Sequence, residues 1–316
     1  MTRLLTPLLL AAIAVIASAC VHELPADTNP DPENTLELHI AHPADWTTRT
    51  HEVETATRAA ATMMRYVVRT YPPGMSQHFN AAPLTEQVIT RPATLEDFTI
   101  TIDRPSGEVE LWVWADCIGS DGRPLHYDAS RLNEVKLTTS PYPACDDSRD
   151  AMCGGIAMHP ADRSLTLQLV RPVARYEFVA TDLAEFLREE SADAGLEGYR
   201  VEFVYTGYLT TAYNAFLGLN YNSVTSITYA GSLRRISETE ASLGFDHVFT
   251  SVGESAVSVQ AYLITPAGTR RAVTPVVNVP IAPGVNTLVR GAFLTVRDQG
   301  GIDIDVDFSG DINIII

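Results

Sequence analysis

The chain has 316 residues, with 39 acidic and 22 basic side chains and a formal net charge of -17 at pH 7. A protein this acidic lacks the basic surface that holds phosphate backbones, which argues against nucleic acid as a partner. The length exceeds one domain of ordinary size, so two domains are predicted.

The chain opens with a secretion signal that ends at a cysteine. Arg3 supplies the basic start, residues 8–17 form an apolar run too short to cross a bilayer, and Ala17-Ser18-Ala19 precede Cys20. Lipoprotein-processing peptidase reads small residues before a cysteine, so we expect cleavage there and acylation of Cys20 with chains such as palmitate. The alternative is an ordinary signal peptide with a coincidental cysteine. Residues 1–19 are thus a predicted lipoprotein signal peptide, and the mature chain is anchored to the membrane by its N-terminal lipid.

A tether is predicted to follow the lipidated cysteine. Residues 20–35 hold three prolines, several acids and few apolar groups. They bury too little apolar surface to offset the conformational entropy lost on ordering, so an extended, mobile spacer is predicted. Removal of the signal peptide takes away one arginine and no acid, so the formal charge of -17 becomes about -18.

Most of the mature chain reads as strands separated by turns. In the stretch 109–115 (VELWVWA), Val109, Leu111 and Val113 alternate with Trp112 and Trp114, which predicts a strand with two apolar faces. Further strands are predicted at 64–71, 98–102, 164–170, 175–180, 199–206, 257–264, 276–279 and 288–296. Frequent turn signals between them favour β-sandwiches over alternating strands and helices.

Helical signals are few. A helix is predicted after Asp182, which forms a capping-box-like start with Glu185, and a single short turn is predicted from Ser237 to Gly244. The fold class is therefore mainly β, with two tandem β-sandwich domains and one or two short helices. We place the N-terminal domain at 36–172 and the C-terminal domain at 173–316.

Three cysteines remain after Cys20. An oxidising compartment permits one disulfide, and Cys145 with Cys153, which flank a polar loop, is the favoured pair. Cys117 stays open as a partner.

No cofactor or metal is predicted. His39, His42 and His51 with Asp45 suggest a metal site, but no helical pair places two ligands on one face, so solvated or packed histidines are favoured. In the C-terminal run, Asp305 begins the first half of a calcium loop that lacks its closing glutamate, because Ile316 stands there.

The C-terminal run is better explained as a strand. Ile302, Ile304, Val306 and Phe308 fall on one face, and the chain ends in three isoleucines. An apolar end of this kind needs burial in its own domain or in a partner, so residues 302–316 are a candidate donor strand.

Sequence motifs for an enzyme are also missing. The chain has no nucleophile elbow, no Gly-rich phosphate loop and no Cys–His arrangement of a protease, so a non-enzymatic role is predicted.

Several segments resemble the fimbrillin-like lipoproteins of Bacteroidota. They are the lipoprotein start, LQLVRPVARYEFVATDL at 167–183, NVPIAPGVNTLVRGAFLTV at 278–296, MRYVVRTYP, VELWVWAD and the tail GGIDIDVDFSGDINIII. The resemblance covers most of the mature chain and implies two transthyretin-like sandwiches that meet near residue 172. It is closest to an uncharacterised branch related to type V pilus subunits and anchors.

The resemblance also implies a mode of assembly. In that family an extended strand from one subunit completes the open sandwich of another. In polymerising members a protease cuts after an arginine to open the groove, and Arg49, Arg58 and Arg65 are candidate sites. The implied protein is an outer-membrane lipoprotein, on the cell surface or periplasmic face, that acts in fimbriae or adhesion with other fimbrial subunits or surface proteins. The alternative is a surface glycan- or nutrient-binding lipoprotein that stacks sugars on Trp46, Trp112 or Tyr208.

Overall fold

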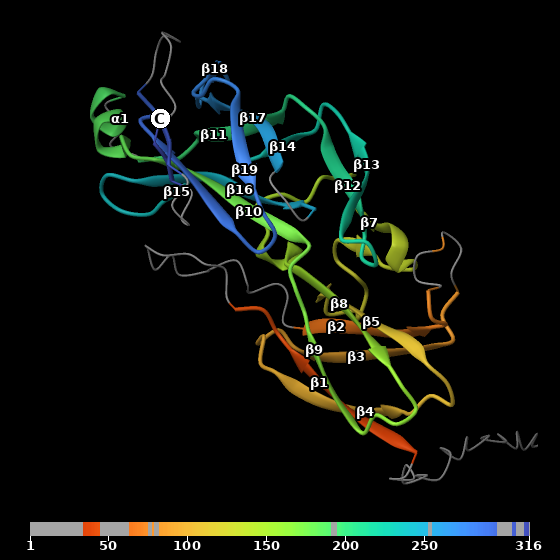
Figure 1. Ribbon diagram of the computed structural model, residues 1–316. Coiled ribbons are helices and arrows are strands. Elements are labelled where there is room, and N and C mark those ends of the chain that lie inside the picture. Colours follow the sequence, from red (N-terminus) through yellow and green to blue (C-terminus); the bar gives the residue numbers. More distant parts are fainter. Residues whose placement is uncertain are drawn as a thin grey trace, which may run out of the picture.

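The computed structural model describes residues 34–44, 63–74, 78, 82–190, 195–251, 255–295, and strand segments 305–307 and 313–315 (Figure 1). This part of the chain is mostly β-structure, as predicted. Its helical elements are one α-helix, α1 (Leu183–Glu189), and two 3-10 turns, Leu132–Glu134 and Asp147–Arg149. Within the described ranges, no helix is long and apolar enough to cross a membrane.

The first half of the chain forms two sheets that face each other across one apolar core. Sheet A has the order β4 (Phe98–Asp103), β1 (Thr35–Ala41), β9 (Ser164–Gln168). Sheet B has the order β3 (Thr85–Pro92), β2 (Met63–Tyr71), β5 (Val109–Ile118), β8 (Ala151–Met158). On β5, Leu111 and Val113 point into this core, whereas Trp112 and Trp114 pack on the opposite face. The predicted two-faced strand is confirmed.

A small third sheet, sheet C, covers the second face of sheet B. Its order is β13 (Leu219–Val224), β12 (Leu209–Asn214), β7 (Val135–Leu137), β6 (Tyr127–Asp128). The pairing of β7 with β12 joins the two halves of the sequence, with Val135 opposite Tyr213. Trp114 and Phe249, one from each half, belong to a shared apolar cluster here. The two halves therefore share an interior instead of meeting only at a linker.

The second half forms another pair of facing sheets. Sheet D has the order β15 (Arg234–Arg235), β16 (Ala241–Phe249), β10 (Val173–Ala180), β20 (Asn286–Gly291), β22 (Asn313–Ile315), β21 (Asp305–Asp307). Sheet E joins β14 (Thr228–Ala230), β11 (Arg200–Tyr205), β17 (Ser255–Ile264) and β18 (Arg270–Ala272), and β19 (Val277–Ile281) pairs with β17. Buried members of the first core end at Leu169 and those of the second begin at Ala174, close to the predicted boundary at residue 172. The division into two domains stays a prediction.

The helix predicted after Asp182 is α1, and it buries Leu183 and Phe186 in the second core. Asp182 does not cap it with its side chain. Its carboxylate instead accepts hydrogen bonds from the backbone N–H groups of Leu294 and Thr295, at 3.2 and 2.7 Å. The capping-box prediction is therefore wrong, because the carboxylate fixes the chain that leaves β20.

The predicted helical turn from Ser237 to Gly244 is also wrong. The Ser237 hydroxyl accepts hydrogen bonds from the N–H groups of Thr239 and Glu240, as a cap would. However, the chain enters β16 at Ala241, because the following residues pair with β10 and bury both faces. The local signal marks a turn before a strand.

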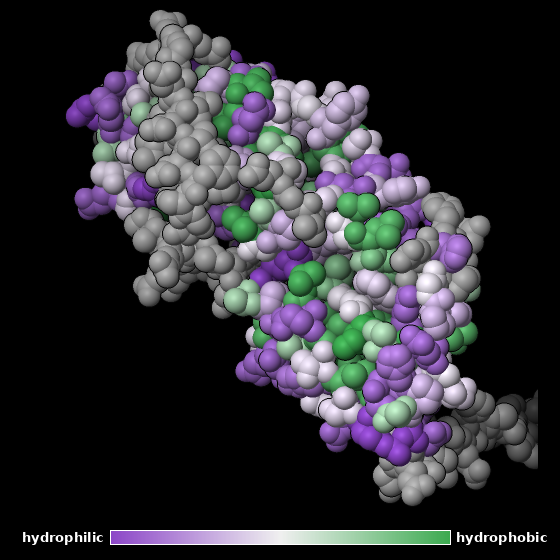
Figure 2. Space-filling model, viewed as in Figure 1, coloured by the Kyte–Doolittle hydropathy of each residue, from purple (hydrophilic) through white to green (hydrophobic). Residues whose placement is uncertain are grey.

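Two strands at sheet edges are exposed along most of their length. On β3 only Ile89 is half-buried, and on β13 only Val224. Leu219 and Tyr221 on β13, and Leu217 just before it, are between 39% and 49% exposed, and hydrophobic residues lie on the surface near β7 (Figure 2). Open edges with unpaired backbone groups are places where another strand can pair.

Candidate functional site

The first strand of the fold lies in the middle of sheet A. β1 pairs with β4 in antiparallel register, with Ile40 opposite Phe98, and with β9 in parallel register, with Ile40 opposite Leu167. Leu36, Leu38 and Ile40 alternate along it and are at most 1% exposed. β1 is therefore bound along both edges and through one face, so it fills a groove between two other strands.

Side chains from three other segments fix the C-terminal end of β1. Asp97 accepts a hydrogen bond from the backbone N–H of His42 at 2.8 Å. Gln168 donates to the carbonyl of His42 at 3.0 Å, and Arg171 donates to the carbonyl of Ala44 at 2.5 Å. We call Asp97, Gln168 and Arg171, together with the His42 that they surround, the β1 clasp.

Of the three candidate cleavage sites, Arg65 is not in an irregular segment. It lies within β2, and its guanidinium binds Asp116 through Nε at 2.6 Å and Nη2 at 3.0 Å. The placement of Arg65 in an irregular N-terminal region is therefore wrong, and cleavage after it stays an untested prediction. Arg49 and Arg58 lie outside the described residues.

The C-terminal tail forms a strand and a return, as predicted. β21 pairs with β22 in antiparallel register, and β22 extends sheet D by pairing in parallel with β20, with Val289 opposite Ile314. Of the predicted inward set, Val306 lies in β21, while Ile302, Ile304 and Phe308 fall outside the described residues. The role of the tail as a donor strand stays a prediction.

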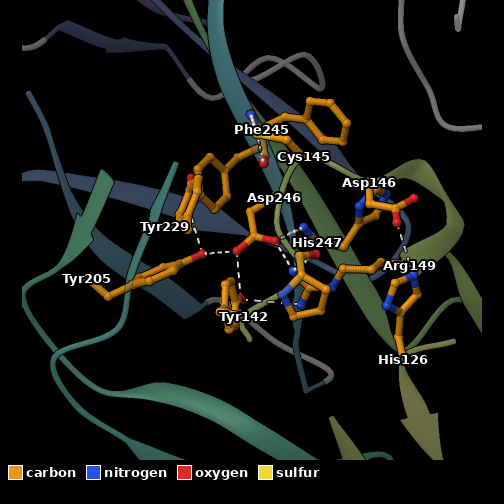
Figure 3. A network of polar contacts seen from close by, with 12 residues as sticks. His126, Tyr142, Cys145, Asp146, Arg149, Tyr205, Tyr229, Phe245, Asp246 and His247 are labelled. Atoms are coloured by element: carbon orange, nitrogen blue, oxygen red, sulfur yellow. Dashed lines mark hydrogen bonds and ion pairs between the residues drawn. The ribbon is translucent and has the colours of Figure 1, made fainter. Parts of the chain in front are cut away.

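A buried polar network links the two halves of the chain, and its centre is Asp246 on β16 (Figure 3). Arg149 forms an ion pair with this carboxylate, and both side chains are at most 1% exposed. The hydroxyls of Tyr142 and Tyr205 donate to it at 2.7 and 2.6 Å, and Tyr176 donates to Tyr205 at 2.7 Å. Burial opposes the charge of Arg149, but Asp246 beside it holds the pKa of the guanidinium well above its usual value.

The segment 142–150, from the first half, supplies one side of this network. Near Arg149, Ser148 is 2.6 Å from Nε2 of His126, and Asp150 pairs with Arg171 at 3.0 Å. The backbone N–H of Cys145 donates to the carbonyl of Phe245 at 3.1 Å, which covers part of the open edge of β16. Because the charged groups are paired and buried, the arrangement holds the halves together and offers no exposed nucleophile for catalysis.

The predicted disulfide is not formed in this structure. None of Cys117, Cys145 and Cys153 is part of a disulfide bond within the described residues. Cys153 is buried in the apolar cluster shared by the halves, where burial raises the pKa of its thiol to about 12. Cys145 instead packs beside Phe245, with Sγ 3.3 Å from its carbonyl oxygen.

Of the candidate metal ligands near the N-terminus, the structure describes His39 and His42. Among the described residues, no group of three or more His, Cys, Asp or Glu is placed to hold a metal ion. His39 and His42 both face Asp97, while Asp45, His51 and most of the calcium-loop candidate lie outside the described residues.

Of the proposed sugar-stacking residues, the structure describes Trp112 and Tyr208. Trp112 is half-buried, packed edge-on against Phe216 and over Gly155, where an added Cβ would lie 2.4 Å from the ring. Tyr208 is 77% exposed, and Trp46 lies outside the described residues. Sequence reasoning identified neither Arg149 nor Asp246, because no motif or spacing connects residues so far apart in the chain.

The chain matches a family of unknown function (DUF6562) over residues 30–316. No curated protein matches it by sequence. Among solved structures, a candidate cell adhesion protein from Bacteroides uniformis is 13% identical, with 81% of this chain and 91% of that chain covered and a TM-score of 0.46. A fimbrial assembly protein from Parabacteroides distasonis is 8% identical, with 81% and 90% covered and a TM-score of 0.40.

The fimbrial anchor protein Mfa2 from Porphyromonas gingivalis is 13% identical, with 76% of this chain and 81% of that chain covered and a TM-score of 0.39. These structures belong to the kinds of protein that the sequence resemblance names. Likeness this distant carries no argument about function, which is instead drawn from the geometry of the chain.

Proposed function

The chain belongs to this family of unknown function, and we propose that it is a non-enzymatic component of fimbrial or adhesive assemblies that acts by β-strand complementation. A lipid on Cys20 would tether the uncut chain to the outer membrane, as the signal sequence predicts, and a cut in residues 45–62 would leave that lipid on the fragment that carries β1. The observation that carries the proposal is the place of β1 in the centre of sheet A.

β1 has the properties of a replaceable strand. It is the first strand of the fold, and residues 45–62 connect it to β2, so a cut in that connection would leave it attached only by non-covalent contacts. Each of its three buried apolar side chains contributes about 1.5–3 kcal/mol relative to exposure. An empty groove between β4 and β9 would therefore be costly, which favours occupation by another strand with the same alternation.

The C-terminal tail is the candidate for the complementary role. β22 adds to sheet D by backbone pairing with β20, which shows that the tail takes up an extended conformation against a sheet. The same backbone groups can pair with a strand of another subunit, because main-chain hydrogen bonds do not depend on side-chain identity.

Strand uptake by a nicked protein tests the proposal. A recognition sequence for a site-specific protease replaces part of residues 45–62, the chain is cut, and excess fluorescent peptide spanning residues 34–44 is added. We expect the cut protein to stay folded and to take up the peptide in a 1:1 complex that survives gel filtration, about one labelled strand per groove.

A matched peptide provides the control. Serine in place of Leu36, Leu38 and Ile40 keeps the backbone and length but removes the apolar face. This peptide should not be retained. Equal retention of both peptides, or retention of neither by a cut protein that remains folded, would contradict complementation at this groove.

A further inference from the structure

The C-terminal end of β1 carries a histidine in an unusual setting. The side chain of His42 is only 2% exposed. Its ring contacts Tyr66 edge-on, with centroids 5.7 Å apart, and also Phe98, at 5.9 Å. A buried imidazole among aromatic rings favours its neutral form, because a charge there loses its hydration.

The two ring nitrogens of His42 differ in their partners. Nε2 lies 2.8 Å from the Tyr66 hydroxyl, within hydrogen-bond distance. Nδ1 is buried and has no hydrogen-bond partner, since the nearest oxygen of Asp97 is 3.6 Å away. A proton on Nδ1 would face the Asp97 carboxylate across 3.6 Å, which is longer than a normal hydrogen bond, so an ion pair with an exposed carboxylate would offset only part of the cost of charging the buried ring.

The charged groups around the ring come from four segments. Asp97 is an exposed carboxylate at the bend before β4, and His39 of β1 also faces it, 3.8 Å away. Arg91 of β3 lies over the Phe98 ring at 4.3 Å from its centroid, and Arg171 binds the carbonyl of Ala44. Two cations thus stand near the site, one of which, Arg171, is paired with Asp150 at 3.0 Å, and the carboxylate of Asp97 is exposed to solvent.

We infer that His42 is a proton-sensitive latch that holds β1 in its groove near neutral pH and loosens it in acid. The inference deepens the proposed function, because β1 is the strand whose replacement that function requires. A protonated His42 would lie among Tyr66 and Phe98 with Arg171 and Arg91 nearby, and it would regain hydration only if the end of β1 leaves the groove.

The direction of the pH effect follows from the ring's surroundings. Burial lowers the pKa of His42, Asp97 partly opposes this, and Arg171 and Arg91 add to it. In the folded state His42 binds a proton less readily than in the unfolded chain, where its pKa is about 6.5. As the pH falls below that value, proton binding therefore favours the open form of β1. The hold on β1 is thus complete above about pH 6.5 and weakens below it. The low pKa of Asp97, caused chiefly by the hydrogen bond from His42, acts only below about pH 4.

Hydrogen exchange on the intact chain tests the latch. Amide exchange of β1 is measured between pH 7.5 and 5.0 and corrected for the chemical rate at each pH, with β5 as the internal reference. We expect the opening of β1, corrected in this way, to rise as the pH falls while that of β5 stays constant, because protonation of His42 favours the open form.

Two variants separate His42 from its neighbour. His42→Gln keeps a polar side chain without a titrating ring, so β1 opening should become independent of pH even if its level changes. His39→Gln removes the exposed histidine that faces the same carboxylate, and its pH profile should follow the parent.

A flat profile in the parent, an unchanged profile in His42→Gln, a flattened profile in His39→Gln, or an equal rise in β5 would each overturn the latch. The result is independent of peptide uptake. If the cut protein does not bind the peptide but the His42-dependent opening is observed, the result contradicts complementation and supports the latch.

Discussion

Replacement of Asp246 by alanine should destabilise the protein by about 3–5 kcal/mol. The change leaves the Arg149 guanidinium, which is 1% exposed, buried without its counter-ion. It also removes the acceptor for the hydroxyls of Tyr142 and Tyr205, and each lost hydrogen bond is worth about 0.5–1.5 kcal/mol. These terms overlap because they belong to one network, so the buried ion pair sets the scale.

Urea unfolding, followed by tryptophan fluorescence and circular dichroism, measures this loss. Glu185→Ala is the matched control, because it breaks the ion pair between Glu185 and Arg188. The side chain of Glu185 is 54% exposed and that of Arg188 is 75% exposed. Such an exposed pair contributes at most about 0.5 kcal/mol. A second variant, Arg149→Met combined with Asp246→Ala, removes both charges and should recover part of the loss. If the free energy of unfolding of Asp246→Ala lies within about 1 kcal/mol of that of the parent, the network does not hold the halves together.

Three further predictions concern the core, the anchor and the tail. Leu167→Ala and Leu169→Ala should each destabilise by about 2–5 kcal/mol in urea unfolding, because both side chains are at most 2% exposed; equal effects of these changes and of Gln168→Ala would contradict the assigned strand face. Gln168→Ala should cost only about 1 kcal/mol, because it removes an amide that donates to carbonyls at the end of β1 and no apolar side chain. Cys20→Ala should abolish membrane retention in cell fractionation, and wild-type sedimentation of the variant would refute lipid anchoring. Deletion of residues 302–316 should either unfold the second half of the chain, since β22 pairs with β20, or abolish association with other subunits in a pulldown while the body stays folded; unchanged thermal stability together with unchanged partners would exclude the tail as a donor.

The fold class could be predicted where burial follows a simple period. On β5, Leu111 and Val113 alternate with Trp112 and Trp114. Each set packs against a different apolar cluster, because sheet B is covered on both faces. α1 was predictable from Leu183 and Phe186 on one stripe. Such patterns depend only on neighbours along the chain.

Strands with glycine or polar residues could not be predicted in this way. β8 contains Gly154 and Gly155, which read as breakers, yet a Cβ at Gly154 would lie 2.8 Å from the carbonyl oxygen of Gln168. β16 carries Asp246 and His247, and it buries every one of its residues because partners from distant segments pair with the polar ones. These strands depend on tertiary contacts that leave no local pattern.

The candidate site was predictable only in part. The alternation of Leu36, Leu38 and Ile40 marks a strand, but its place between β4 and β9 comes from long-range pairing. The Ser237 signal failed because the same hydroxyl cap serves a turn before a strand as well as a helix.

Crosslinking in the cell envelope tests strand complementation most directly. A photo-crosslinking residue replaces Thr99, whose strand β4 lines the groove beside β1, and cells that express the protein are irradiated before the protein is purified. The account predicts a crosslink to an extended segment of another subunit, identified by mass spectrometry, in place of the chain's own β1. Crosslinks to its own β1 alone, with no other subunit recovered, would contradict the account.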